Sequence, residues 1–207
     1  SSDGDEDKKI LLSDFKTEVV TQQIAYDGGQ SIAATTADGP MTFGVAGGAT
    51  VAPLEIEGTT TVPTTSLASG QMYYSTTINE LMAYDGSRSK WLSTAPYTLA
   101  FGVNNGADGV AMRLAGNILN TAAGYRVPFD CTIVSIMGHS TSGNATKGFD
   151  IEINGTTDTS FNFAANLFTN TAVNIDVDAG ERLSIFISAT GGAINNPNLV
   201  LYIKNRT

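Results

Sequence analysis

The chain has 207 residues, only 15% of them are charged, and the formal net charge at pH 7 is −9. An acidic chain whose 11 Lys and Arg are scattered is a poor partner for nucleic acid or for an anionic membrane, so we expect neither. No apolar run approaches the roughly 18 residues of a transmembrane helix, which argues against membrane insertion, and a single Cys excludes an internal disulfide.

Residues 1–26 begin with a polar, acidic segment and continue into a stretch that fits either a helix or a strand. Within Ile10–Tyr26, the residues Leu11, Phe15 and Val19 share helical spacing, whereas the β-branched residues around Val19 favour a strand. Both alternatives stay open, and extended structure is preferred because the rest of the chain has β patterns. We therefore expect an extended N-terminal arm here.

Residues 27–69 are interrupted by seven Gly and three Pro, and the apolar islands between them are too small to form a core in one chain. A flexible linker is one interpretation, and a stalk in which three chains intertwine is the other. Leu54 and Ile56 alternate with Glu55 and Glu57, as in a strand with two different faces. Because a pure linker has no reason to alternate, an intertwined stalk is predicted.

Residues 70–96 are expected to form a small β-hairpin module that acts as a collar. Two short strand-like runs are joined by a turn, and Asp85-Gly86 supplies further turn geometry. Tyr73, Tyr84 and Trp91 could stack on host sugars or could form the core of the module. The core is the favoured interpretation, because a short hairpin has few other apolar groups to bury.

Residues 97–207 show the strongest strand signals of the chain. Phe149, Ile151 and Ile153 alternate with polar residues, and Asn154-Gly155 follows with the chemistry of a tight hairpin turn. Strand candidates in this half are Thr98–Val103, Gly109–Asn120, Tyr125–Gly138, Lys147–Asn154, Thr159–Phe168, Val173–Val177, Leu183–Ile187 and Leu199–Ile203. Seven or eight strands separated by turns predict an antiparallel β-sandwich in an all-β protein.

Two stretches resemble parts of bacteriophage appendages. Gly70–Ser93, with the sequence GQMYYSTTINELMAYDGSRSKWLS, resembles a small module of phage tail fibres and other virion proteins. The pattern in residues 98–206, with an acid–Ala–Gly–acid turn at Asp178–Glu181, resembles the head domains of phage fibres and the C1q/TNF-like trimeric jelly-roll group. This resemblance implies a homotrimer with a jelly-roll-like head, in which contacts between copies would bury Phe186 and Tyr202.

The resemblance implies a non-enzymatic structural component of a phage virion, either a trimeric fibre or a capsid-decoration appendage that contacts the host surface. Its partners would be two further copies of itself, capsid or tail proteins bound through residues 1–26, and a host surface glycan. It would reside in the virion after assembly in the host cytoplasm. The alternatives are a dedicated carbohydrate-binding tip of a tail fibre, a polysaccharide-degrading spike, and a cellular C1q-like or spore-surface adhesin.

No pattern of residues indicates catalysis, a cofactor or a metal site. One His and one Cys are too few for the common zinc sites, and phosphate-binding and hydrolase motifs are absent. Cys131 is expected to be a small buried apolar residue. Asp150 and Glu152, on one face of one strand, do not flank a sugar-sized cleft and are interpreted as solubilising residues, as are Asp176 and Asp178.

Loops at the ends of the predicted head domain are the candidates for host contact, because small polar residues there can hydrogen-bond a glycan. These loops are 139–146 and 190–198. The candidate contact residues are His139, Ser140, Asn144, Asn195 and Asn196.

Overall fold

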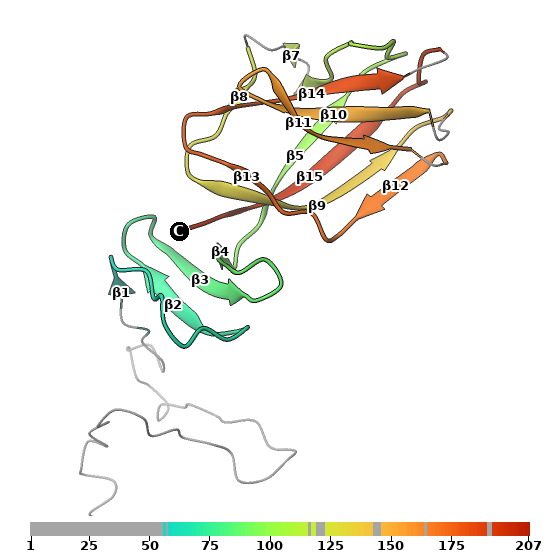
Figure 1. Ribbon diagram of the computed structural model, residues 1–207. Helices are drawn as coiled ribbons and strands as arrows, with labels where there is room; N and C mark the ends of the chain where they lie inside the picture. The colour runs from blue at the N-terminus through green and yellow to red at the C-terminus, as the bar shows by residue number, and fades with distance from the viewer. Residues whose placement is uncertain are drawn as a thin grey trace, which may run out of the picture. The chain divides into compact units, whose positions relative to one another are not determined.

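The computed structural model describes residues 56, 58–115, 117–118, 123–142, 146–163, 165–189 and 192–207, which belong to the compact unit Glu55–Thr207 (Figure 1). Regular structure in these residues consists only of β-strands, so the all-β prediction is confirmed for this part of the chain. No helix that could cross a membrane occurs in it. The expected arm at residues 1–26 and most of the expected stalk at residues 27–69 lie outside the described residues and stay predictions.

The first sheet is a small four-stranded unit, which we call the module. Its strands, in spatial order, are β1 (Gly58–Thr59), β2 (Met72–Ser75), β3 (Glu80–Asp85) and β4 (Lys90–Ser93). β2, β3 and β4 form an antiparallel meander, and β1 runs parallel to β2. The sequence predicted two strands here, and the structure adds a third around Trp91 and pairs β1, from the expected stalk, with the same chain.

Aromatic residues form the core of the module, as predicted. Tyr73, Met82 and Trp91 are buried, and the rings of Tyr73 and Trp91 meet edge to face with centroids 4.8 Å apart. Tyr84 approaches Trp91 from the other side at 5.3 Å, and the indole N–H of Trp91 donates to the carbonyl oxygen of Pro63 at 2.9 Å. Tyr73 and Trp91 are therefore used inside the module and do not present open faces to a sugar, and Tyr84 is half-buried against them.

Residues 97–207 form two facing sheets (Figure 1). The small sheet contains, in spatial order, β11 (Thr156–Asn162), β10 (Lys147–Ile153), β14 (Arg182–Ala189) and β8 (Tyr125–Arg126). The large sheet contains β12 (Leu167–Asn170), β9 (Cys131–His139), β15 (Asn198–Asn205), β5 (Tyr97–Gly102), β6 (Arg113–Leu114) and β7 (Asn117–Ile118), and β13 (Ile175–Val177) also pairs with β9. We refer to this two-sheet unit as the sandwich.

The core of the sandwich follows the alternation seen in the sequence. Phe149 and Ile151 of β10 and the alternate residues of β14 and β15 are fully or almost fully buried, and three further Phe rings gather around Phe149. Gly148 permits β11 to come close, because an added Cβ would lie 1.9 Å from the carbonyl oxygen of Phe161. Asn154 and Gly155 both have positive φ, 54° and 84°, as the predicted hairpin turn requires.

Three predicted strands are interrupted in the structure. Tyr125–Gly138 is divided into β8 and β9, which flank Pro128, a residue without a backbone N–H for pairing. Thr159–Phe168 contains the end of β11 and the start of β12, which lie in different sheets. In Gly109–Asn120, the described residues form only the short strands β6 and β7. Alternation marks residues that face the core, but it does not show where the chain changes sheet.

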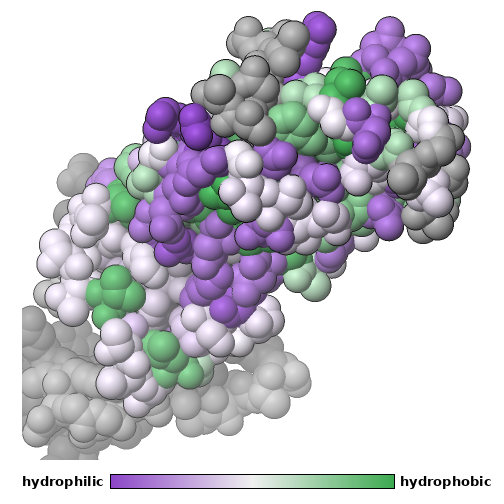
Figure 2. Space-filling model, turned by 45° about the horizontal axis from the view of Figure 1, so that its top comes forward, coloured by the Kyte–Doolittle hydropathy of each residue, from purple (hydrophilic) through white to green (hydrophobic). Residues whose placement is uncertain are grey.

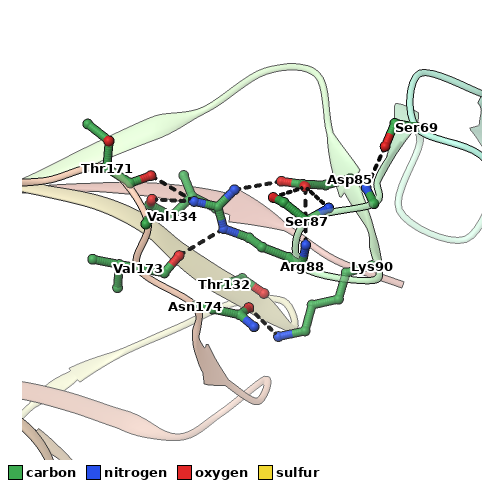
Figure 3. A network of polar contacts seen from close by, with 12 residues as sticks. Ser69, Asp85, Ser87, Arg88, Lys90, Thr132, Val134, Thr171, Val173 and Asn174 are labelled. Carbon is green, nitrogen blue, oxygen red and sulfur yellow. Dashed lines mark hydrogen bonds and ion pairs between the residues drawn. The ribbon is translucent and has the colours of Figure 1, made fainter.

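Arg88, from the turn between β3 and β4, joins the module to the sandwich (Figure 3). Its guanidinium donates to three backbone carbonyls of the sandwich, those of Val134, Thr171 and Val173, at 2.8–2.9 Å. It also pairs with Asp85 at 2.6 Å, and this carboxylate accepts hydrogen bonds from the backbone and hydroxyl of Ser87. One side chain thus ties the module to two segments of the large sheet.

The end of β15 makes a second connection. Asn205 donates to Glu80 at 2.8 Å, and the hydroxyls of Tyr73 and Thr207 hydrogen-bond to each other. The backbone of Arg206 also forms an antiparallel bridge with that of Leu92 in β4. The chain end marked in Figure 1 therefore lies against the module.

Acidic residues of the sandwich complete this junction. Asp176 accepts from Lys90 and Thr132 at 2.6 and 2.7 Å, and Asp178 accepts from Arg206. Both acids are exposed, as expected of solubilising residues, but Asp176 also pairs with Lys90 of the module and so helps to hold the two parts together, whereas Asp178 pairs with Arg206 within the sandwich.

Candidate functional site

Catalytic groups do not converge in the described part of the chain. Cys131 is fully buried, as expected, and burial raises the pKa of its thiol, so it stays protonated. His139 lies at the other end of β9, eight residues away, which corresponds to about 26 Å along a strand. Within the described residues no group of three or more His, Cys, Asp or Glu is placed to hold a metal ion.

Asp150 and Glu152 share the outer face of β10 but are half-buried, which differs from the exposed position that we expected. Burial and the charge of Asp150 raise the pKa of Glu152. One oxygen of each carboxylate is buried without a hydrogen-bond partner among the described residues. The two acids are neighbours on a single strand, so they do not face each other across a cleft as glycosidase carboxylates do.

The outer face of the large sheet is the most distinctive surface of the sandwich. The strand register aligns two rows of side chains across β12, β9, β15 and β5. The first row is Thr169, Met137, Val200 and Ala100, and the second is Leu167, His139, Asn198 and Gly102. We call these eight positions the outer face.

Apolar side chains on the outer face remain open to solvent. Met137 is 46% exposed and Leu167 is 69% exposed, although both are large hydrophobic residues. They line a hollow of about 230 Å³ together with His139, Phe168 and other residues of β12, β9 and β15. His139 is the one ionisable side chain among the eight positions. A weakly charged surface with large apolar side chains is typical of protein–protein contact.

Hydrophobic residues elsewhere are more dispersed. On the face of the molecule seen in Figure 2, hydrophobic residues occur in small groups among hydrophilic ones. Single exposed apolar side chains are ordinary on protein surfaces. The outer face differs because its apolar residues adjoin one another in register.

The loops predicted to contact a host lie together at one end of the sandwich. The backbone N–H and hydroxyl of Thr141 both donate to the carbonyl oxygen of Asn195, and the N–H of Asn195 donates to Ser142. Of the predicted contact residues, His139, Asn195 and Asn196 are exposed there.

The other two predicted contact residues have different outcomes. Ser140 is fully buried, so it cannot touch a host molecule, and its backbone N–H donates to the carbonyl oxygen of Asn166. Asn144 lies outside the described residues. Host contact by these loops stays a prediction, and the sequence could not separate Ser140 from its exposed neighbours, because the alternation of β9 ends there.

Phe186 and Tyr202 are less exposed than we expected for a single chain. Both are half-buried. Tyr202 lies on the same side of the large sheet as the outer face, between Ser135 and Thr98, and Phe186 lies next to Asp150 on the small sheet. Burial of these rings therefore does not depend wholly on another copy of the chain.

Comparisons with known proteins identify no relative: no family model, no curated protein and no solved structure matches this chain. The interpretation of the site therefore depends on its chemistry.

Proposed function

We propose that this chain is a non-enzymatic structural component of a bacteriophage virion, a homotrimeric fibre or capsid-decoration appendage that contacts the host surface. Residues 1–26 attach it to capsid or tail proteins, residues 27–69 form a shared stalk, and the sandwich is a jelly-roll-like head. Three heads on one stalk multiply weak contacts with a host through avidity.

The outer face carries this proposal. A chain that works as a monomer gains nothing from holding Met137 and Leu167 in water on a flat, weakly charged sheet. Burying them against further copies of the chain removes that apolar area from water. The low proportion of charged residues also supports contact between copies, since extensive contact reduces the need for a charged surface.

The mass of the protein in solution tests the proposal. Light scattering should give a species of three times 21.6 kDa. Leu167→Lys should weaken the association of the heads, because it places a charge in the contact and every copy contributes one. We expect at least a tenfold loss of affinity, which corresponds to about 1.4 kcal/mol.

A matched control is Thr157→Lys, which adds the same side chain to an exposed position of the small sheet. It should leave the mass unchanged. A wild-type protein that stays monomeric at high micromolar concentration would contradict the proposal. Equal weakening by both variants would show that the outer face is not the contact between copies.

A dedicated carbohydrate-binding tip of a tail fibre is the second candidate function. The convergence of the loops at 140–142 and 193–196 favours it, because the exposed amides of Asn195 and Asn196 lie next to His139 at one end of the sandwich. A panel of host glycans separates the two functions. Binding that Asn195→Ala and Asn196→Ala abolish would favour the tip.

A further inference from the structure

A cavity of about 370 Å³ lies where the module meets the sandwich. Its wall combines residues of the β2–β3 segment with residues that flank β9 and follow β15. The residues that matter for its chemistry are Ser75, Thr77, Ile78, Phe129, Asp130 and Arg206. Because β9 begins at Cys131 and ends at His139, this cavity lies at the opposite end of that strand from the predicted host-contact loops.

One side of the cavity is apolar. Phe129 is 45% exposed although it is a large hydrophobic residue, and Ile78 and Val62 are half-buried beside it. An aromatic face carries partial negative charge and attracts the weakly positive C–H groups of a ligand that lies flat against it. Phe129 can therefore act as a platform for a ring that has C–H bonds on one side.

The remaining wall presents hydrogen-bonding groups that the protein leaves unused. Ser75 is 2% exposed and lines the cavity, yet its hydroxyl makes no hydrogen bond within the described part of the chain. One oxygen of Asp130 accepts from the backbone N–H of Ala179 at 2.7 Å, and its second oxygen has no partner there. Neither group is among the buried side-chain atoms that lack a partner, so both are open to the cavity, where they can bond to water or to a ligand that replaces it.

The charges around the cavity argue against an anionic ligand. Arg206 brings a positive charge to the wall, but it pairs with Asp178, and its Nε lies 3.7 Å from Asp176. Lys90 also pairs with Asp176, so with Asp130 three carboxylates stand near two cations, and the net negative charge opposes an anion. A purely apolar ligand is also disfavoured, because it would desolvate Asp130 and Ser75 without giving them hydrogen bonds.

We propose that this cavity binds one unit of a neutral saccharide. A pyranose ring has a C–H face that fits Phe129, and its hydroxyl groups both donate and accept. Asp130 would accept from them, Arg206 would donate, and Ser75 and Thr77 would do either. The cavity volume falls within the range of small-molecule sites. This inference does not depend on a trimer, since all the residues of the cavity come from one chain.

Saturation-transfer NMR on the full chain tests the proposal, with the methyl glycosides of glucose, galactose, mannose and N-acetylglucosamine as probes. At least one of them should bind with a dissociation constant on the order of 1 mM, as expected for a single sugar ring. Phe129→Ala should weaken that binding about fivefold or more. Ser75→Ala should weaken it about threefold to tenfold.

Stability measurements separate binding from a structural role. Because the hydroxyl of Ser75 has no partner in the protein, Ser75→Ala should leave the melting temperature unchanged or slightly raised. Thr157→Ala, which trims an exposed side chain on the small sheet, is the control and should leave sugar binding intact.

Three results would overturn the proposal. They are the absence of saturation transfer from all four glycosides, equal loss of binding in Thr157→Ala and Phe129→Ala, and equal affinity for the anionic methyl glucuronide. A protein that binds sugar as a monomer would contradict the trimer but not this site.

Discussion

The module and the sandwich hold together by different means. The sandwich has twenty buried hydrophobic residues in one cluster, whereas the module has three, counted over the described residues. A sheet with so small a core is marginal by itself. The module compensates with polar bonds to its neighbour, through Arg88, Lys90 and Glu80. The comparison shows that a small sheet can be fixed by hydrogen bonds to a larger one that already has a core.

The largest expected effect comes from opening the core of the sandwich. Phe149→Ala removes a fully buried ring that contacts the rings of Phe161, Phe163 and Phe168, and it should lower the free energy of unfolding by about 3–5 kcal/mol. The module should unfold in the same transition, because its anchoring carbonyls belong to the sandwich. Denaturation by urea, followed by far-UV circular dichroism and by fluorescence, measures both. A module signal that survives loss of the sandwich would contradict the comparison.

Cutting the junction should have the next largest effect. Arg88→Met keeps the length of the side chain but removes the bonds to three carbonyls and to Asp85, with an expected loss of about 1.5–3 kcal/mol. Trp91 is the only Trp of the chain, so its fluorescence reports on the module alone. In Arg88→Met, the unfolding transition of the module, followed by Trp91 fluorescence, should come at a lower urea concentration than the transition of the whole protein, followed by circular dichroism.

Arg88→Lys is the matched variant, since it keeps the charge but not the planar fork of donors. It should give an intermediate loss. Coincident transitions in Arg88→Met would show that the two parts do not depend on this side chain.

Acid should weaken the same junction. Burial opposes the ionisation of Asp85, but hydrogen bonds from Ser87 and Arg88 outweigh it and lower the pKa to about 2. Because the folded pKa lies below the unfolded one, the stabilisation is fully present above about pH 4 and is lost as the pH falls toward 2. Asp176 acts in the same direction, since hydrogen bonds from Lys90 and Thr132 outweigh burial and lower its pKa.

Urea denaturation followed through Trp91 fluorescence at pH 7, 4, 3 and 2 tests this expectation. The transition should move to lower urea concentration as the pH falls from 4 to 2. Asp85→Asn should be less stable at pH 7 and should show a smaller change with pH. An unchanged pH dependence in Asp85→Asn would remove Asp85 from the explanation.

The smallest expected effect comes from replacing one turn residue in the module and one in the sandwich. Asn79 in the module and Asn154 in the sandwich have φ of 60° and 54°, a region that disfavours Ala. Asn79→Ala and Asn154→Ala should each cost about 1 kcal/mol. Asn154→Ala should cost more, because its amide bonds both Glu181 and the backbone of Arg182, whereas Asn79 accepts one bond, from Tyr74.

The corresponding Gly variants keep the turn geometry and lose only the hydrogen bonds of the side chain. Asn79→Gly should therefore recover more stability than Asn154→Gly. Equal recovery would show that the bonds of Asn154 contribute little. Thermal melting of the four variants measures the difference.

Much of the sandwich could be predicted from the sequence. Phe149 and Ile151 alternate with acids in β10, and Asn154-Gly155 closes the hairpin with residues that accept positive φ. Of the candidate contact residues, His139 and Asn195 are exposed as expected and Ser140 is not, whereas their contact with a host stays a prediction. The outer face was missed, because alternation places Met137 outward without showing that Leu167 of another strand lies next to it.

The sequence by itself determined which residues face inward, because alternation along a strand is a local property with a period of two. Only the tertiary structure decided what the polar residues do. Arg88 looks like an ordinary charged turn residue, and Asp176 looks like a solvated acid, until the fold brings them together with partners more than eighty positions away. Such bonds depend on how whole sheets are placed, and no short window of sequence contains that information.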